Sequence, residues 1–468
     1  MAPPAMLRDV GLRSLLLLSS AVAALSIGVN YGTLGNNLPP PAQVASFLQA
    51  KTTIDRIKIF DSNPDIIRAF AGTRISLTIS TTNGDIPGLV SREGAAAWVA
   101  NHVTPFFPAT NIDLILVGNE ILLSGDKNLI VNLVPAMHSL HNALVAAGFR
   151  RIRVSTPHFL GILAASEPPS TARFRYGWEK SVLIPMLNFH RATKSPFIVN
   201  PYPYFNYNPQ TLNYAIFRKN GGILDKYTKI RYTNMLDAQL DAIYSAMKRI
   251  GYGDVQIMIG ETGWPTQAEP GQAGVSPDYA ASYINGLISK VSSGRGTPLM
   301  PGRRFETYIF ALFNENLKPG PIAERNWGLF RPDFSPMYNA LGIMKGQIVG
   351  RPSGTGAGGG SWCVPKAGVS TAALQNNINY ACSNANCKAI QAGGSCFQPN
   401  NLQAHAAYAM NAYYQAQGRR PFTCNFAGSG FVTSRNPSNK LFTLPLICFP
   451  FIYLKFFTYS ICFAFLIA

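Results

Sequence analysis

Short apolar, β-branched runs alternate with helical patterns along residues 27–350. Apolar side chains recur at helical spacing in the segments between the runs, for example over 129–147 and 235–250. Strands that alternate with helices form parallel sheets, and eight such units over about 320 residues predict an α/β fold, a closed (β/α)8 TIM barrel. The eight expected strands are 27–31, 56–60, 75–79, 114–117, 152–155, 197–200, 257–260 and 308–313.

An open, doubly wound sheet is the alternative arrangement of such units. It usually carries a glycine-rich phosphate-binding turn after its first strand. Residues 30–35 (NYGTLG) occupy that place and lack the dinucleotide-binding spacing. The sequence therefore favours the barrel.

Composition excludes several classes of protein. The 468 residues are 47% hydrophobic and 13% charged, whereas a largely disordered chain has low hydrophobicity and high charge. The net charge is +18, but no run of five Lys or Arg and no nucleic-acid-binding motif occurs. We therefore expect no nucleic-acid partner, and we interpret the diffuse positive charge as suited to an acidic matrix such as a wall polysaccharide.

Cysteine usage divides the chain into two domains. Residues 1–362 contain none of the seven cysteines, so the first domain depends on a large core, whereas the cysteine-dense second domain is small enough to need disulfides. A metal cluster is the competing interpretation, but no CxxC pair occurs and only His405 lies among the cysteines. We therefore expect disulfides formed in an oxidising compartment. A Gly- and Ser-rich linker, 351–361, separates the domains.

Both ends of the chain carry apolar segments. Residues 1–26 combine early arginines, an apolar run and small residues in the order of a secretory signal, with cleavage expected before Ile27. Residues 439–468 form an apolar tail interrupted by Pro445, Pro450 and Lys455. Three interpretations of the tail remain open: a removed glycolipid-anchor signal that attaches the chain to a membrane, a transmembrane helix, or an aberrant extension of the reading frame.

Two carboxylates stand where predicted strands stop. The fourth strand is followed by Asn119 and Glu120, and the seventh by Glu261. In a barrel the carboxyl ends of the strands form the active-site face, and glycoside hydrolysis needs two carboxyl groups. Either glutamate alone could equally be a helix cap or an ion-pair partner.

Aromatic residues suited to stacking on sugar rings also follow strand ends, although each of them alone could be a core residue. They are Tyr31, Tyr202, Phe205, Trp264 and Trp327. Motifs of metalloproteases, serine hydrolases and P-loop proteins are absent from the sequence, and its six histidines lack ligand spacing. We therefore expect no cofactor and no metal.

These features resemble the plant endo-β-1,3-glucanases of glycoside hydrolase family seventeen. The matching stretches are 27–32 (IGVNYG), 117–120 (VGNE), 200–205 (NPYPYF), 261–265 (ETGWP) and 310–316 (FALFNEN). The resemblance implies a retaining mechanism on β-1,3-glucan, with Glu120 as general acid/base and Glu261 as nucleophile. It also implies that Asn119 binds the 2-hydroxyl. Further cleft-lining residues carried over from the family are Glu306, Glu315 and Lys318.

Residues 362–438 resemble carbohydrate-binding module family forty-three, on stretches such as 379–382 (NYAC), 393–397 (GGSCF) and 403–411 (QAHAAYAMN). The resemblance implies the pairs Cys363–Cys424 and Cys382–Cys387, and a third disulfide of Cys396. The family's last cysteine follows an Asn-Pro-Ser like 436–438, whereas the next cysteine here is Cys448, inside the tail. The candidate glucan-binding aromatics are Trp362, Tyr408, Tyr413 and Tyr414; each could instead belong to the core of the module.

The combined prediction is a secreted, monomeric endo-1,3-β-glucosidase of the cell wall with an appended glucan-binding module. Two other functions remain open. One is a glucan-binding wall or plasmodesmal protein with little turnover. The other is a transglycosylase, because a sugar can intercept a retaining intermediate in place of water.

Overall fold

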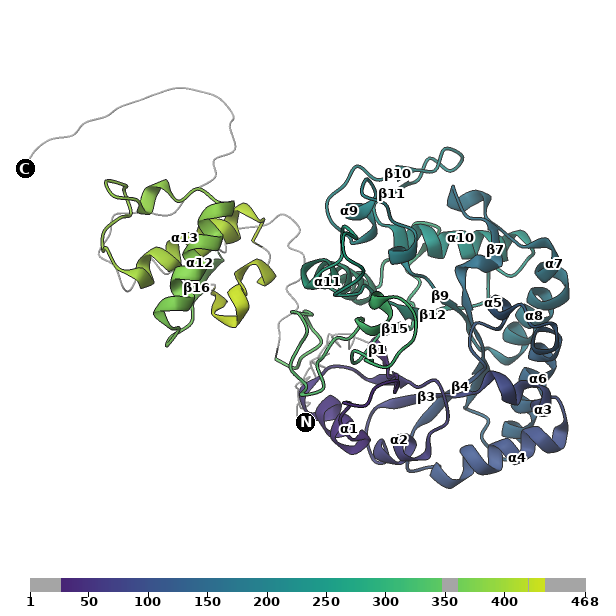
Figure 1. Cartoon of the computed structure of the whole chain (residues 1–468). Coiled ribbons are helices and arrows are strands. Elements are labelled where there is room, and N and C mark those ends of the chain that lie inside the picture. Colours follow the sequence, from purple (N-terminus) through teal and green to yellow (C-terminus); the bar gives the residue numbers. More distant parts are fainter. Residues whose placement is uncertain (1–26, 347–360, 420, 434–468) are drawn as a thin grey trace, which may run out of the picture. The chain divides into compact units, whose positions relative to one another are not determined.

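The computed structural model describes residues 27–346, 361–419 and 421–433 (Figure 1). They fall into two compact units, divided between residues 349 and 350. The predicted signal 1–26, most of the predicted linker and the predicted tail 439–468 lie outside the described residues.

The first unit is a barrel of parallel strands, which confirms the predicted fold class. Its nine strands lie in the order β5-β4-β3-β2-β1-β15-β12-β9-β6, and every neighbouring pair is parallel. The two outermost strands, β5 and β6, are separated by Thr156 alone, so the sheet returns on itself. The barrel strands are β1 (Ile27–Asn30), β2 (Arg56–Lys58), β3 (Ser76–Thr81), β4 (Ile112–Val117), β5 (Arg153–Ser155), β6 (Pro157–Phe159), β9 (Phe197–Asn200), β12 (Ile257–Thr262) and β15 (Thr307–Ile309).

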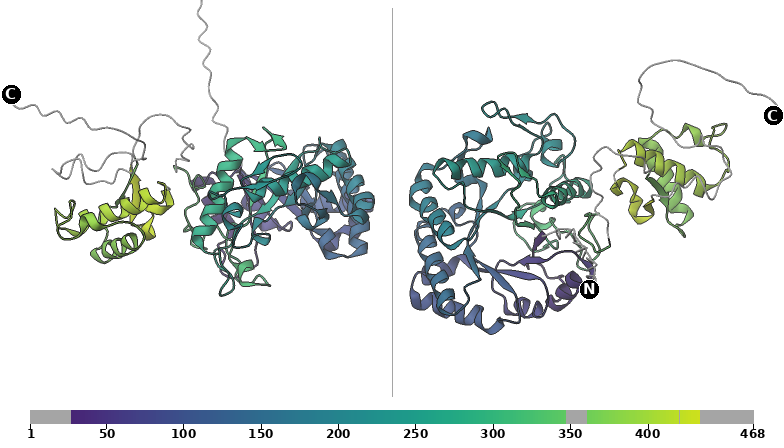
Figure 2. Two further views of the ribbon diagram at one scale, coloured as in Figure 1. Left: turned by 90° about the horizontal axis from the view of Figure 1, so that it is seen from above. Right: turned by 180° about the vertical axis from the view of Figure 1, so that it is seen from behind.

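All eight predicted strands are present, and β6 is the one barrel strand that was not predicted. The last strand ends earlier than expected, because the chain leaves the ladder after Ile309. Helices surround the strands (Figure 2). They are α1 (Pro41–Lys51), α2 (Pro64–Ala69), α3 (Ile86–Leu89), α4 (Arg92–His102), α5 (Ile121–Ser124), α6 (Lys127–Ala146), α7 (Tyr176–Trp178), α8 (Ile184–Thr193), α9 (Leu212–Ala215), α10 (Met235–Arg249) and α11 (Pro277–Ser293).

The two helices predicted by periodicity form as α6 and α10, and side-chain caps define where they begin. The Asp126 carboxylate accepts hydrogen bonds from the first amides of α6, and Asn234 accepts one from Asp237 N in α10. Such caps satisfy backbone donors that have no partner inside the helix.

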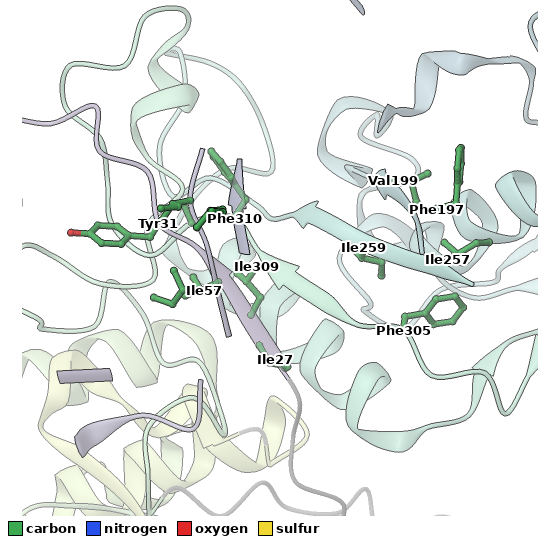
Figure 3. Packing of buried hydrophobic residues seen from close by; sticks show 14 of the residues in the cluster. Ile27, Tyr31, Ile57, Phe197, Val199, Ile257, Ile259, Phe305, Ile309 and Phe310 are labelled. Atoms are coloured by element: carbon green, nitrogen blue, oxygen red, sulfur yellow. The ribbon is translucent and has the colours of Figure 1, made fainter. Parts of the chain in front are cut away.

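The barrel has two apolar layers. Inside it, a small cluster is formed by Leu114, Leu116, Ile198, Met258 and Tyr308. Outside it, alternate strand residues pack against the helices, and Figure 3 shows such residues of β1, β9, β12 and β15. Gly28 is required beside the Tyr308 ring, because a Cβ there would collide with it.

An ion-pair cluster occupies the amino-terminal end of the barrel. Glu306 precedes β15, and its carboxylate is held by Arg56 (2.5 Å) and Arg153 (2.8 Å) at the starts of β2 and β5. Arg153 also binds Asp113 at 3.1 Å. Glu306 therefore lies at the end of the barrel opposite the carboxyl ends of the strands, and the prediction that it lines the cleft is wrong.

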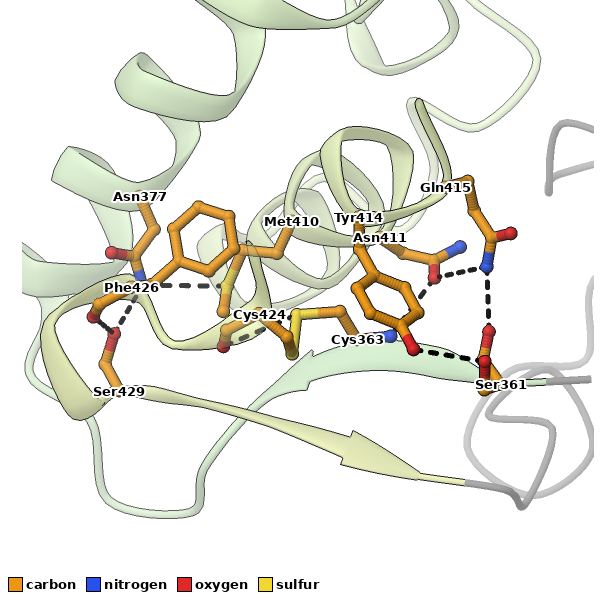
Figure 4. The surroundings of a disulfide bond; sticks show 10 residues. All are labelled: Ser361, Cys363, Asn377, Met410, Asn411, Tyr414, Gln415, Cys424, Phe426 and Ser429. Carbon is orange, nitrogen blue, oxygen red and sulfur yellow. Dashed lines mark hydrogen bonds between the residues drawn. A yellow bond between two sulfur atoms is a disulfide. The ribbon is translucent and has the colours of Figure 1, made fainter. Parts of the chain in front are cut away.

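The second unit is a small helical module with a two-stranded antiparallel sheet. It consists of β16 (Trp362–Pro365), α12 (Thr371–Asn384), α13 (Leu402–Ala416) and β17 (Gly430–Thr433). The predicted disulfides Cys363–Cys424 and Cys382–Cys387 are both present, and the first joins β16 to the segment after α13 (Figure 4). Cys396 is buried in the module. Its predicted third disulfide involves residues outside the described chain and stays a prediction.

Candidate active site

A cleft of about 1400 Å³ lies at the carboxyl ends of the barrel strands. Loops that follow β1, β2, β4, β6, β9 and β15 all contribute to its walls, together with Glu261 of β12. Eight of the predicted site residues line it: Asn119, Glu120, Tyr202, Phe205, Glu261, Glu315, Lys318 and Trp327.

Glu120 occupies a strained turn between β4 and α5. Its backbone is left-handed (φ 49°), which is uncommon for a residue with a side chain, and its amide donates to Pro157 O at 3.2 Å. Asn200 Nδ2 donates to Glu120 Oε1 at 2.8 Å. Burial, followed by the negative charge of Glu261, raises the pKa of Glu120 to about 7, although the Asn200 hydrogen bond opposes the rise.

Glu261 lies in β12 and has different partners. Lys58 Nζ, from β2, is 2.5 Å from Glu261 Oε1, and the Lys58 side chain is 1% exposed. Tyr202 donates its hydroxyl hydrogen to Glu261 Oε2 at 3.0 Å. A buried ammonium and a phenol therefore hold one oxygen each of this carboxylate.

Glu315 and Lys318 form a second polar group of the cleft, on the loop after β15. The Leu34 amide donates to Glu315 Oε1 at 2.9 Å, and burial raises the pKa of Glu315. Gly32 has no room for a side chain, because a Cβ would collide with this carboxylate. Lys318 pairs with Glu324 at 3.0 Å and lies over the Phe310 ring.

Three of the five predicted aromatic residues line the cleft. Phe205 is 60% exposed, Tyr202 is half-buried, and Trp327 is buried beside both. Tyr202 and Trp327 meet edge to face, with ring centroids 5.4 Å apart. The exposed Phe205 ring offers the largest free aromatic surface of the three.

Two aromatic predictions are wrong. Trp264 is fully buried, and its Nε1 donates to Gly274 O at 2.9 Å, so it braces the loop after β12. Tyr31 is 2% exposed and packs against Phe313 in the core. Position after a strand end places a residue at the correct end of the barrel, but the local turn decides whether the side chain faces the cleft or the core.

Sequence reasoning missed three polar residues of the site: Asn200 and Glu324, which line the cleft, and Lys58, which pairs with Glu261. Lys58 could have been noticed as a charge inside an apolar strand, since buried lysines are rare unless they are paired. Asn200 ends β9 within a stretch that had been noticed for its aromatic residues. Glu324 lines the cleft from a short 3-10 helix (Ile322–Arg325), where no strand end marks its position.

Four buried polar atoms of cleft residues have no hydrogen-bond partner among the described residues. They are Asn119 Oδ1, Asn200 Oδ1, Gln239 Oε1 and Trp327 Nε1. Buried polar atoms are normally satisfied, so each unpaired one needs an explanation. Three acceptors and one donor that border a cleft provide places for the hydroxyl groups of a ligand.

Residues 27–340 match the model of the glycosyl hydrolases family 17, and this match covers most of the chain. The chain belongs to glycosyl hydrolase family 17. Residues 361–431 match the X8 domain, which confirms the predicted carbohydrate-binding module.

Two relatives resemble this chain over about nine tenths of its length, and a solved structure resembles it over 67%. A glucan endo-1,3-beta-glucosidase of Triticum aestivum is 56% identical over 436 residues, which are 90% of this chain and 94% of the relative. Glucan endo-1,3-beta-glucosidase 7 of Arabidopsis thaliana is 45% identical over 88% of this chain and 82% of its own length. A solved beta-1,3-glucanase of Cryptomeria japonica pollen is 39% identical, with a TM-score of 0.63 over 67% of this chain and 98% of its own.

The X8 domain exposes some of its predicted binding aromatics and buries one. Trp362, Tyr408 and Tyr413 are half-buried. Tyr414 is 1% exposed, with its hydroxyl 3.1 Å from Ser361 Oγ, so its assignment as a binding residue is wrong (Figure 4). Tyr380, which was not predicted, is 51% exposed and packs edge to face on Tyr413.

Proposed function

We propose that the chain hydrolyses internal β-1,3-glucosidic bonds with retention, using Glu261 as the nucleophile and Glu120 as the general acid/base. The main support for this proposal is that two carboxyl groups of one cleft have different electrostatic surroundings. Glu120 has an amide as its side-chain partner and a pKa raised to about 7, whereas Glu261 is paired with the ammonium of Lys58. A retaining glycosidase needs one protonated and one ionised carboxyl group.

In the first step the Glu261 carboxylate attacks the anomeric carbon while the Glu120 carboxyl group gives its proton to the departing glycosidic oxygen. The bond between the anomeric carbon and the glycosidic oxygen breaks, and a glycosyl ester forms between the anomeric carbon and Glu261. Lys58 and Tyr202 hold the carboxylate in place for this attack. Glu120 keeps its proton at mildly acidic pH because burial raises its pKa.

In the second step Glu120, now ionised, takes a proton from a water molecule. The water oxygen attacks the anomeric carbon and displaces Glu261, which restores both carboxyl groups. Two inversions at one carbon leave the product with the configuration of the substrate.

A β-1,3-glucan is the substrate that the cleft and the relatives together support. Phe205 offers a ring for stacking on a sugar, and Asn119 Oδ1 is available to accept from a 2-hydroxyl group. The similar proteins of Triticum aestivum and Arabidopsis thaliana are both glucan endo-1,3-beta-glucosidases. The X8 domain supplies a second surface for the same polymer.

The chain acts outside the cell, in the wall. The secretion pattern of residues 1–26 and the disulfides support this location, because disulfides form in oxidising compartments. Membrane attachment through residues 441–468 remains one of the three interpretations of the tail.

Incubation with a soluble β-1,3-glucan, followed by size analysis of the products, tests this function. We expect short oligosaccharides from the wild type and none from Glu261→Gln, because an amide cannot form the ester. Loss of a covalent nucleophile should lower the rate by more than about 10³-fold. Products longer than the substrate would indicate transfer to sugar, and an unchanged polymer would indicate a binding protein.

A further inference from the structure

One part of the cleft is built by two excursions from the barrel. The first follows β6 and contains β7 (Leu163–Ala165), a short 3-10 helix (Pro169–Thr171) and β8 (Arg173–Phe174); the second follows β9 and contains β10 (Ile223–Leu224) and β11 (Arg231–Tyr232). In Figure 1 the β10–β11 hairpin lies at the periphery of the barrel unit. The lining residues of this part are largely apolar: Leu163, Ala164, Pro168, Ile223 and Leu224.

The two strands of the hairpin are held unequally. β11 is anchored in the core by Tyr232, which is 1% exposed and donates its hydroxyl hydrogen to Asp241 Oδ2 at 2.9 Å. β10 joins β11 through only two residue pairs, and its Ile223 and Leu224 are 49% and 46% exposed, so core packing does not fix β10. The distance between β10 and the opposite wall therefore depends on a further contact.

Asp225 provides that contact. It follows β10 directly, is 1% exposed, and accepts hydrogen bonds from Ser170 N and Ser170 Oγ in the first excursion, both at 3.0 Å. It also accepts from Tyr227 N (3.0 Å) and Thr228 N (3.2 Å) in its own turn. Burial alone would raise the pKa of Asp225, but these hydrogen bonds lower it overall, so the carboxylate stays ionised at the pH of a cell wall.

We propose that this apolar part of the cleft binds glucan units remote from the bond that is cleaved, and that Asp225 sets its width by tying the two excursions together. The inference rests on the proposed function, because it takes the ligand to be a β-1,3-glucan. Because this side of the cleft is already fixed before binding, binding avoids the entropy cost of ordering a loop around the glucan. Only substrates long enough to reach this part gain from it, so Asp225 is a positioning residue for chain length.

Asp225→Asn is the most discriminating substitution. The amide has the shape of the carboxylate, but it must point its NH2 group either at Ser170 N or at the amides of the turn, and each of these is a donor. We expect kcat/KM to fall about three- to tenfold for long oligosaccharides, the effect of losing one or two hydrogen bonds, with a progressively smaller fall as the substrate shortens. The fall should appear in KM rather than in kcat.

A second variant and a control keep this test decisive. Ile223→Ser with Leu224→Ser changes only exposed side chains and should show the same dependence on chain length. Asp65→Asn, an exposed acid-to-amide change in α2, is the matched control and should change no substrate's kinetics. An equal fall for all chain lengths, or no fall in either variant, would overturn the inference. A wild type that cleaves no β-1,3-glucan would instead overturn the proposed function.

Discussion

Glu120 and Glu261 are the same type of residue in different electrostatic surroundings. Glu120 has Asn200 as its side-chain partner and is raised in pKa by burial, whereas Glu261 lies against the ammonium of Lys58. Such a contrast assigns separate roles to two carboxyl groups that share a cleft.

Glu120→Gln should lose activity in proportion to how much the leaving group needs a proton. An amide cannot protonate the glycosidic oxygen, so hydrolysis of glucan should fall by about 10²–10⁴-fold. An aryl glycoside with a good leaving group should still form the ester at nearly the wild-type rate. Burst kinetics with both substrates measure this difference, and an equal loss for both would argue against the acid role.

The pH profile should report the titration of Glu120. Because the acid has to be protonated, kcat/KM should be high below pH 7 and fall as pH rises through the Glu120 pKa of about 7. The Asn200 hydrogen bond lowers this pKa, so Asn200→Ala should move the alkaline limb to higher pH. A limb that stays in place in Asn200→Ala would assign the titration to another group.

Lys58→Met should remove the buried ion-pair partner of Glu261, the proposed nucleophile. An unpaired buried carboxylate is costly, so we expect a loss of about 3 kcal/mol in the free energy of unfolding and about 10²-fold in kcat. Lys58→Arg keeps the charge and should lose less, and the exposed Lys127→Met is the control. Denaturant unfolding and steady-state kinetics measure both effects; wild-type values in Lys58→Met would contradict the pairing.

Strand direction explains which residues the elements bring to the cleft. Residues that follow a parallel strand, such as Glu120 and Glu315, reach the active-site face. Glu306 precedes β15 and therefore lies at the other end, where it joins Arg56 and Arg153. Glu306 is acidic, as expected of the cleft residue, but it lies at the amino-terminal end of β15, whereas the cleft lies at the carboxyl ends of the strands.

Glu306→Gln should therefore affect stability and leave catalysis unchanged. Burial raises the pKa of Glu306, but the hydrogen bonds and charges of Arg153 and Arg56 lower it overall. The ion pairs of Glu306 therefore stabilise the fold at pH values above the ordinary pKa of a glutamate. We expect a loss of about 3 kcal/mol at neutral pH, which disappears as pH falls through the lowered pKa. Thermal unfolding at several pH values measures it, with the exposed Glu93→Gln as control. A lower kcat without a change in stability would contradict this account and support a role for Glu306 in the cleft.

The elements were largely predictable, because parallel barrel strands are buried on both faces and stand out as apolar runs. The strand β6 was not predicted because its three residues, 157–159 (PHF), form no apolar run, yet it pairs with β9. The two glutamates proposed as catalytic follow the same rule of strand ends. Lys58 was missed and Trp264 was wrongly assigned, because contacts between distant segments, not local sequence, decide what a buried polar or aromatic side chain faces.

At the scale of the whole molecule, two units with separate cores carry two activities on one polymer. The barrel has a large apolar core, whereas the X8 domain combines a small core with disulfides. The 61-residue separation of Cys363 and Cys424 lies in the range where a cross-link stabilises by about 4 kcal/mol. The module should therefore depend strongly on this bond.

The X8 domain, produced as residues 361–438, should be retained on insoluble β-1,3-glucan. Tyr413→Ala or Tyr408→Ala should weaken retention without unfolding the domain, because both rings are only half-buried. Tyr414→Ala should instead lower the melting temperature, since Tyr414 belongs to the core. Pull-down and thermal unfolding separate these effects. Wild-type module left in the supernatant would contradict glucan binding.

Covalent trapping tests the central claim, that Glu261 is the nucleophile of a retaining glucanase, most directly. The wild-type chain is incubated with an activated 2-deoxy-2-fluoro derivative of a β-1,3-linked disaccharide, which slows hydrolysis of the ester more than its formation. Peptide mapping by mass spectrometry should then find one disaccharide bound to Glu261. A label on any other residue, or no adduct together with a product of inverted configuration, would contradict the account.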